Sequence, residues 1–262
     1  MAVNKLSLNV SKTRFMIFHY PQKKLLQTEI PTLEMNSIPI KRTLDFNFLG
    51  LTISEDLQWN AHINKVSNKI SKTIGMMFRI KRFVNQSILK LIYNALVLPH
   101  LNYSLLCWGF SIHRLNKLQK KAIRVICLSK YNAHTDPLFK TLHLLKVGDL
   151  FNVNALKFVH KYHNNKLPPY FHGMLDSSFH THNYNTRNPI SNLPIPKRST
   201  TKKSIRYFIP SLMIDTHASI TDKILTHCLQ GFGSYAKKHY ISNYNAHCDI
   251  ENCYICGITE NA

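Results

Sequence analysis

The feature that most constrains this chain is a stretch, residues 57–135, that contains 13 lysines and arginines but no aspartate or glutamate. Apolar residues recur in it at spacings of three and four, which is the period of an α-helix with one buried face. Basic helix surfaces usually also carry acids four residues away, because the opposite charges stabilise the helix. Here the cations are unopposed in the sequence, so the electrostatic field of the stretch has one sign and favours a negatively charged partner.

Two helices of this stretch carry both an apolar stripe and a basic stripe, and in the first helix the two stripes lie on opposite sides. The first is expected from Asn60, its N-cap, with an apolar stripe of Ile63, Val66, Ile70, Ile74 and Met77. Its basic stripe consists of Lys65, Lys69, Lys72 and Arg79. The second helix spans about residues 113–128, with an apolar stripe of Leu115, Leu118, Ala122 and Val125 and a basic stripe of Arg114, Lys117, Lys121 and Arg124. Two basic stripes on separate helices predict a groove that follows nucleic-acid phosphates.

Between these helices, residues 91–113 carry no Lys, Arg, Asp or Glu. That length could span a bilayer, but the stretch contains polar Asn94 and Asn102, and Pro99 interrupts the helix. We therefore expect a helix that begins at Ser87 and stops at Pro99, followed by a second apolar element in a protein core. Further helices are expected near Asp136 and from Asp149 to about residue 168.

The residues before the acid-free stretch have the pattern of short β-strands. Residues 6–54 contain alternating apolar runs, with a turn expected at Asn36 and Ser37. Gly50 suggests a bulge or a close approach of another backbone. Glu55 and Asp56 are expected at the junction from strand to helix, where a helix N-terminus favours negative charge.

The C-terminal third is less regular. Residues 177–214 contain no carboxylate and several prolines, which predicts a basic irregular arm, followed by a weak helical region near residues 219–232. The tail offers residue types that bind tetrahedral zinc, namely His247, Cys248, Cys253 and Cys256. Only one CxxC pair is present, so the zinc spacing is incomplete, and we keep zinc only as a candidate cofactor of the tail.

Composition points to the same class of partner. The chain has 34 Lys+Arg against 13 Asp+Glu, a net charge of +21, which favours nucleic-acid phosphates or an anionic membrane surface. Six cysteines without a signal-like N-terminus predict a reducing compartment, and hence an intracellular protein of the nucleus or cytoplasm. The sequence contains no GxSxG motif, P-loop or carboxylate pair suited to two metal ions, so the residues alone predict no catalytic centre.

Several segments, taken together and in order, resemble the C-terminal part of a reverse transcriptase from a LINE-like, non-LTR retrotransposon. They are "NKLSLNVSKTRFMIF" (4–18), "FNFLGLTISEDLQWNAHINKVSNKISKTIG" (46–75), "LVLPHLNYSLLCWG" (96–109), "LNKLQKKAIRVI" (115–126), "AHTDPLFKTLHLLKVGDL" (133–150) and "HNYNTR" (182–187). The resemblance covers about residues 4–210.

The resemblance implies a role for particular residues. Lys12 stands where the family places a lysine near the incoming nucleotide. Phe48, Leu49 and Gly50 stand in the primer-grip hairpin, which holds the 3′ end of the growing strand. The helices that follow correspond to the thumb, whose basic faces hold the template–primer duplex, an RNA–DNA hybrid or duplex DNA.

The resemblance also implies what this sequence lacks. In this family the catalytic carboxylates hold Mg²⁺ and lie on upstream strands that end in a motif of tyrosine or phenylalanine, any residue, and two aspartates. No two adjacent aspartates occur in this sequence. We therefore expect a truncated RNA-directed DNA polymerase with no catalytic residue and no cofactor of its own, unable to polymerise alone.

The expected fold is α+β but mainly α. It has three parts: a small N-terminal antiparallel β region with the end of the palm and the primer grip (1–58), a helical thumb-like bundle (59–170), and the basic arm with its Cys/His-containing tail (171–262). Two rival functions remain at this point: a basic helical module that binds proteins or a membrane surface, and a genomic relic without function.

Overall fold

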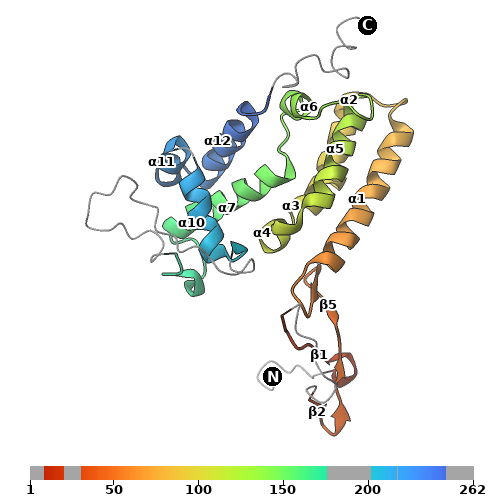
Figure 1. Ribbon diagram of the computed structural model, residues 1–262, viewed down its shortest axis with the longest axis vertical. Coiled ribbons are helices and arrows are strands. Elements are labelled where there is room, and N and C mark those ends of the chain that lie inside the picture. Colours follow the sequence, from red (N-terminus) through yellow and green to blue (C-terminus); the bar gives the residue numbers. More distant parts are fainter. Residues whose placement is uncertain (1–8, 21–30, 176–201, 217, 246–262) are drawn as a thin grey trace, which may run out of the picture. The chain divides into compact units, whose positions relative to one another are not determined.

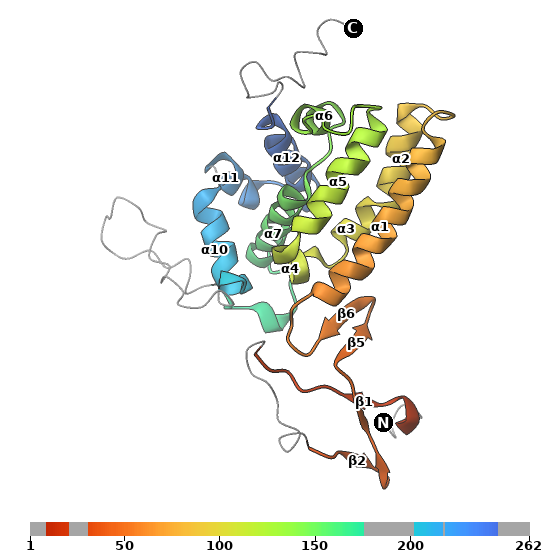
Figure 2. The same cartoon turned by 45° about the vertical axis from the view of Figure 1, so that its right-hand side comes forward.

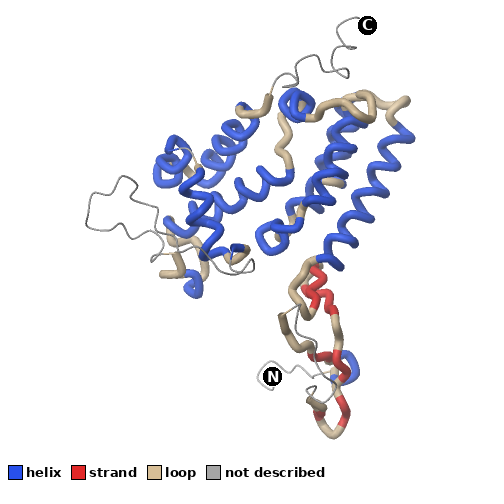
Figure 3. Tube along the Cα trace, in the orientation of Figure 1, coloured by secondary structure: helices blue, strands red, loops and turns tan. Residues whose placement is uncertain are grey.

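The computed structural model describes residues 9–20, 31–175, 202–216 and 218–245. Contacts divide the chain into two compact units, residues 1–69 and 70–262, and the division falls within helix α1 (Asn60–Ile80). The described strands all precede this helix, and the rest of the described chain is mainly helical, as the sequence predicts (Figure 3). Among the residues described, no helix combines the length and the apolar character that a membrane crossing requires.

The described residues of the first unit form three separate two-stranded sheets. Its strands are β1 (Arg14–Phe15), β2 (Glu34–Met35), β3 (Ile38–Pro39), β4 (Lys41–Arg42), β5 (Asp45–Phe48) and β6 (Leu51–Ser54), preceded by the 3₁₀ turn η2 (Val10–Lys12). β2–β3 and β5–β6 are antiparallel hairpins, as expected, whereas β1 pairs with β4 in parallel. The parallel pair was not expected, because partner strands that are separated by another hairpin leave no local signal in the sequence.

Both hairpins turn on two residues with positive φ. These are Asn36 (52°) and Ser37 (60°) in the first hairpin, and Leu49 (46°) and Gly50 (83°) in the second. Positive φ at both central residues is characteristic of the turn whose twist matches the flanking strands. Gly50 therefore lies in a turn and not in a bulge, and glycine suits this position because it adopts the left-handed conformation without steric cost.

The two acids that follow β6 have different partners. The Glu55 carboxylate accepts a hydrogen bond from Nη2 of Arg42 at 2.5 Å, so it ties β4 to the hairpin. Asp56 accepts from Oγ of Ser54 at 2.6 Å and from the backbone N–H of Gln58 at 2.9 Å. Burial acts to raise the pKa of Asp56, but these hydrogen bonds lower it overall. Asp56 thus closes the turn just ahead of α1, close to where the sequence places it, while Glu55 has a separate structural role.

The second unit is a bundle of helices that begins within α1. The helices after α1 are α2 (Gln86–Leu96), α3 (Leu98–Asn102), α4 (Leu105–Trp108), α5 (His113–Ile126), α6 (Asp136–Thr141), α7 (Val147–His163), α10 (Ile205–Asp215), α11 (Ala218–Thr226) and α12 (Leu229–Ser242), with 3₁₀ turns η4 (Gly109–Ser111) and η5 (Pro169–Phe171). Figures 1 and 2 show α7 in the middle of this unit, with α5 on one side and α10–α12 on the other.

The apolar segment that could have suggested a membrane span forms α2, α3 and α4. The N-cap of α2 is Asn85, whose Oδ1 accepts from the N–H of Ile88 at 2.9 Å. The sequence had suggested Ser87 instead. Pro99 was expected to end this helix, but α2 already ends at Leu96. Pro99 lies in the first turn of α3, where a missing N–H removes no helical hydrogen bond. The fully buried Trp108 closes the segment.

The C-terminal helices pack onto α7. Ala155, Leu156 and Val159 of α7 form one apolar cluster with residues of α10, α11 and α12, namely Ile209, Leu212, Ile220, Ile224 and Phe232. Helical structure is thus more extensive here than the weak region expected near residues 219–232. Proline and glycine obscured it in the sequence: Pro210 lies inside α10, and Gly231 and Gly233 lie near the start of α12. Packing against α7 overrides these weak local propensities.

One buried glutamine connects three elements of the bundle. The side chain of Gln119, in α5, is fully buried. Its Nε2 donates to the Tyr93 hydroxyl at 2.8 Å and to the Leu145 carbonyl at 2.9 Å, and its Oε1 accepts from the N–H of Val147 at 2.8 Å. Gln119 therefore joins α5 to α2 and to the start of α7, where Val147 would otherwise have an unsatisfied N–H.

We predict that Gln119→Ala destabilises the protein by about 2–4 kcal/mol, because it leaves several buried polar groups without partners. Chemical denaturation followed by circular dichroism measures this change. Lys121→Ala, on the exposed side of the same helix, is the control and should alter stability by at most about 0.5 kcal/mol. Equal effects of the two substitutions would contradict the structural role of Gln119.

Candidate nucleic-acid interface

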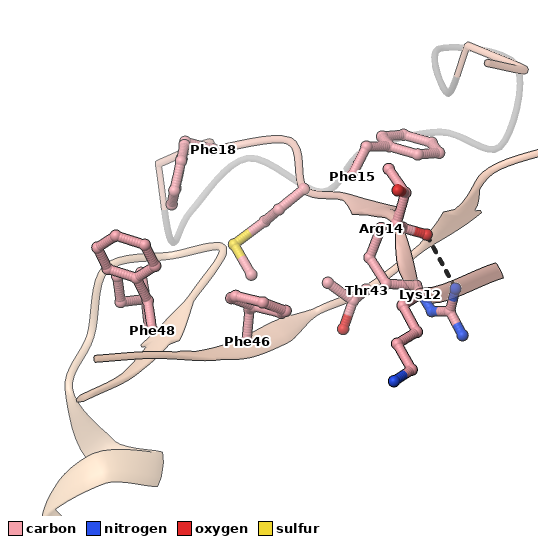
Figure 4. A pocket seen from close by; sticks show the side chains of 10 residues that line it. Lys12, Arg14, Phe15, Phe18, Thr43, Phe46 and Phe48 are labelled. Atoms are coloured by element: carbon pink, nitrogen blue, oxygen red, sulfur yellow. Dashed lines mark hydrogen bonds between the residues drawn. The ribbon is translucent and has the colours of Figure 1, made fainter. Parts of the chain in front are cut away.

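A cavity of about 420 Å³ lies in the first unit, between residues 12–18 and the β5–β6 hairpin. Its lining consists of Lys12, Thr13, Arg14, Phe15, Met16, Phe18, Thr43, Phe46, Phe48 and Ile53. In Figure 4 the rings of Phe18, Phe46 and Phe48 gather at one end, and the cationic ends of Lys12 and Arg14 lie on the side away from them. Aromatic faces with cations nearby suit a ligand that carries a flat ring and a phosphate.

The backbone before β1 fixes the cationic side of this cavity. Asn9 caps η2 by accepting from the N–H of Lys12 through Oδ1 at 3.2 Å. Nη1 of Arg14 donates to the carbonyl oxygens of Ser11 at 2.7 Å and of Thr13 at 2.9 Å. The sequence "NVSKTR" thus folds on itself and presents Lys12 as an exposed side chain.

The structure brings together two of the residues that the resemblance singled out. Lys12 and Phe48 line the same cavity, although 36 positions separate them in the sequence (48 − 12). Leu49 and Gly50 form the adjacent turn and do not line the cavity, and the Leu49 side chain is 74% exposed.

Eight of the ten lining residues were missed at the level of the sequence, among them Phe46, Arg14 and Phe18. Phe46 could have been found, because it lies two positions before Phe48 and so shares its face of β5. Arg14 and Phe18 lie on another segment, and no local pattern connects them with the hairpin. Their proximity follows from the tertiary structure alone.

Helix α1 has the two-sided character that the sequence predicts. Its apolar stripe is buried, with exposed fractions of 5% for Ile63, 7% for Val66, 0% for Ile70, 2% for Ile74 and 0% for Met77. The predicted cations are all exposed, namely Lys65, Lys69, Lys72 and Arg79. α1 therefore presents a continuous basic stripe away from the side that packs.

Helix α5 is similar, with one difference. Arg114, Lys117 and Lys121 are exposed, whereas Leu115, Ala122 and Val125 are buried and Leu118 is half-buried. Arg124 is also half-buried, and its Nε donates to the Ala133 carbonyl at 2.8 Å. Burial lowers the pKa of Arg124, although a guanidinium stays charged at neutral pH. Arg124 thus also anchors the loop after α5.

Figures 1 and 2 show the C-terminal half of α1 beside α2 and α5 in the second unit. Lys72 and Arg79 of the α1 stripe therefore belong to the same unit as the α5 stripe, whereas Lys65 and Lys69 belong to the first unit. That the two stripes face one common groove stays a prediction.

The start of α1 is joined to the hairpin through a histidine. The side chain of His62 is 4% exposed, and its Nδ1 accepts from the backbone N–H of Thr52, in β6, at 3.3 Å. Burial is the main cause that lowers the pKa of His62, and the charges of Lys65 and Lys69 add to it. A neutral His62 can accept this hydrogen bond, whereas a protonated one cannot.

The candidate zinc ligands of the tail, His247, Cys248, Cys253 and Cys256, lie outside the described residues. Within the part that the structure describes, no group of His, Cys, Asp and Glu side chains is arranged to hold a metal ion. Comparisons with protein-family models, with curated proteins and with solved structures found no match to this chain.

We predict that His62 makes stability depend on pH. The unfolded chain binds a proton near the ordinary histidine pKa of 6.5, while the folded chain binds it only at lower pH. Stability that is present above pH 6.5 is therefore lost as the pH falls below it. His62→Asn keeps an acceptor but does not titrate, so it should lose less stability between pH 7.5 and 5.5 than the unmodified chain. Denaturant midpoints at the two pH values measure this, and parallel losses would contradict it.

Proposed function

We propose that this chain binds the backbone of a nucleic-acid duplex, an RNA–DNA hybrid or duplex DNA, as the primer-grip and thumb part of a non-LTR retrotransposon reverse transcriptase. The observation that carries the proposal is the charge arrangement of α1 and α5. Seven exposed cations lie on these two amphipathic helices, in a stretch of sequence without one carboxylate: Lys65, Lys69, Lys72, Arg79, Arg114, Lys117 and Lys121.

The physical argument concerns phosphate repulsion. Each duplex phosphate carries a negative charge, and each cation that neutralises one releases a bound counterion. A carboxylate among the cations would repel phosphate and cancel part of this gain. A solubilising surface has no need to exclude acids in this way, because mixed charges serve solubility equally well.

The cavity of the first unit supports the part of the proposal that concerns the strand end. Phe46 and Phe48 offer ring faces on which an unpaired terminal base can stack, with Lys12 and Arg14 available for its phosphate. The exposed hairpin turn at Leu49 and Gly50 allows close approach of a sugar–phosphate backbone.

Binding of a defined DNA duplex should be nearly independent of sequence and steeply dependent on salt. Replacing Lys65, Lys69, Lys72 and Arg79 together by glutamine should reduce the slope of log K against log salt by roughly 3–4, since each neutralised phosphate contributes about −0.9. Fluorescence anisotropy at several salt concentrations measures this slope.

The matched control replaces four exposed cations elsewhere, Lys161, Lys166, Lys202 and Lys203, and so removes the same net charge. This control variant should retain most of the original slope. Equal reductions in the two variants would mean that only net charge matters, which contradicts a defined binding surface.

The second expectation concerns catalysis. The sequence contains no adjacent aspartates to hold two Mg²⁺ ions, so we predict that the purified chain extends no primer with magnesium or manganese while still binding template–primer. A primer-extension assay tests this, with a commercial reverse transcriptase as positive control. Template-dependent synthesis by this chain would contradict the assignment of a non-catalytic part.

The rival function is a module that binds a membrane surface or a protein. Flotation with anionic liposomes, compared with a gel shift on duplex DNA, separates it from the proposal. Liposome binding without a shift of the duplex would favour the rival.

A further inference from the structure

Helix α2 is apolar on the side that faces away from the bundle as well as on the side that faces it. Leu89, Tyr93 and Val97 lie on the inner side and are fully buried. On the outer side, Leu91 is 66% exposed and Ile88 is 42% exposed. Aliphatic side chains exposed at neighbouring positions on one face of a helix are typical of an interface, so the outer side of α2 has the character of an interface.

The exposed residues form a regular stripe. Ile88, Leu91 and Ala95 follow one another at spacings of three and four, which places them within about 60° of one another at 100° per residue. We call these three residues the α2 seam. Spacings of i, i+3, i+7 are those with which one helix contacts another along its length.

The charges around the α2 seam are all of one sign. Lys81 and Arg82 precede it, Lys90 lies on the same helix, and the nearest acids in the sequence are Asp56 and Asp136. Phe83, 86% exposed in the connection between α1 and α2, extends the apolar surface at the N-terminal end of the seam.

We propose that the α2 seam docks an acidic amphipathic helix of another polypeptide. Leucine-type side chains of that helix would pack between Ile88 and Leu91, and its carboxylates would face Lys81 and Arg82 at the N-terminal end of the seam. This interaction is separate from duplex binding, because it uses aliphatic side chains of α2 and none of the basic stripes.

The charges near the seam favour an acidic helix over a second copy of the chain, and the burial of α2 disfavours a membrane surface. In a second copy of the chain every cation beside the seam would approach cations of the same kind, and each copy carries +21. Helices that lie on a membrane combine an apolar face with a strongly charged opposite face, whereas the face of α2 opposite the seam is buried in the bundle.

The test uses the full chain and a labelled synthetic peptide of about three heptads, with leucine at positions a and d and glutamate at e and g. Leu91→Gln should weaken binding by at least about tenfold, because the lost contact buries a whole leucine side chain. Glutamine is a good helix former and Leu91 is exposed, so the fold should persist, and a thermal melt checks this.

Leu96→Gln is the matched control. Leu96 is 45% exposed on the same helix but lies about 140° away from Leu91, outside the reach of a helix docked on the seam. This variant should bind the peptide as the unmodified chain does. A second peptide, with serine in place of every leucine but the same glutamates, should not distinguish the variants.

Other outcomes overturn the proposal. Equal binding by the Leu91→Gln variant, or no binding of the acidic peptide to any variant, would show that the seam does not dock such a helix. A dimer in sedimentation that Leu91→Gln dissociates would assign the seam to a second copy. Flotation with phosphatidylserine vesicles that depends on Leu91 would assign it to a membrane. Duplex binding by the same variants should be unchanged, so this test is independent of the proposed function.

Discussion

The helices that begin the second unit fold without a single carboxylate, and this constraint shapes the rest of the molecule. Like charges three or four residues apart destabilise a helix by about 0.2–0.5 kcal/mol per pair, and α1 contains two such pairs and α5 five. Apolar burial on their inner sides must offset this cost, together with neutral hydrogen bonds such as those of Gln119. Repulsion between these neighbouring cations lowers the stability of the free protein, and duplex phosphates would reduce that repulsion.

Two acids of the second unit, Asp136 and Asp149, connect helices of the bundle. Asp136 pairs with Lys146 at 2.6 Å, and Asp149 accepts from the Tyr244 hydroxyl at 2.5 Å. Burial raises the pKa of Asp149, and the hydrogen bond from Tyr244 opposes this shift. The ammonium of Lys140 donates to the Tyr244 carbonyl at 2.8 Å, so the end of α12 is fastened to α6 and α7. These contacts make the C-terminal helices part of the rigid support of the bundle.

The long amphipathic helices and the hairpin turn at Asn36 and Ser37 could be predicted from the sequence, because each rests on local periodicity or turn chemistry. Helix α10 and the parallel pairing of β1 with β4 could not, since both depend on contacts between distant segments. The lining residues of the candidate cavity differ in the same way. Phe46 could be predicted because it shares the face of Phe48 along one strand, whereas Phe18 reaches the cavity only through the tertiary fold. Arg124 was expected among the exposed cations, and its bond to Ala133 could not be read from helical spacing.

The central claim is that the basic stripes of α1 and α5 contact phosphates. Acetylation of lysines in the native protein, read by mass spectrometry with and without bound duplex, tests it residue by residue. If the basic stripes contact phosphates, bound duplex should protect Lys65, Lys69, Lys72, Lys117 and Lys121 from acetylation. Lys161, Lys166, Lys202 and Lys203 should react as they do in the free protein. Uniform protection of all lysines, or protection of the second set alone, would contradict it.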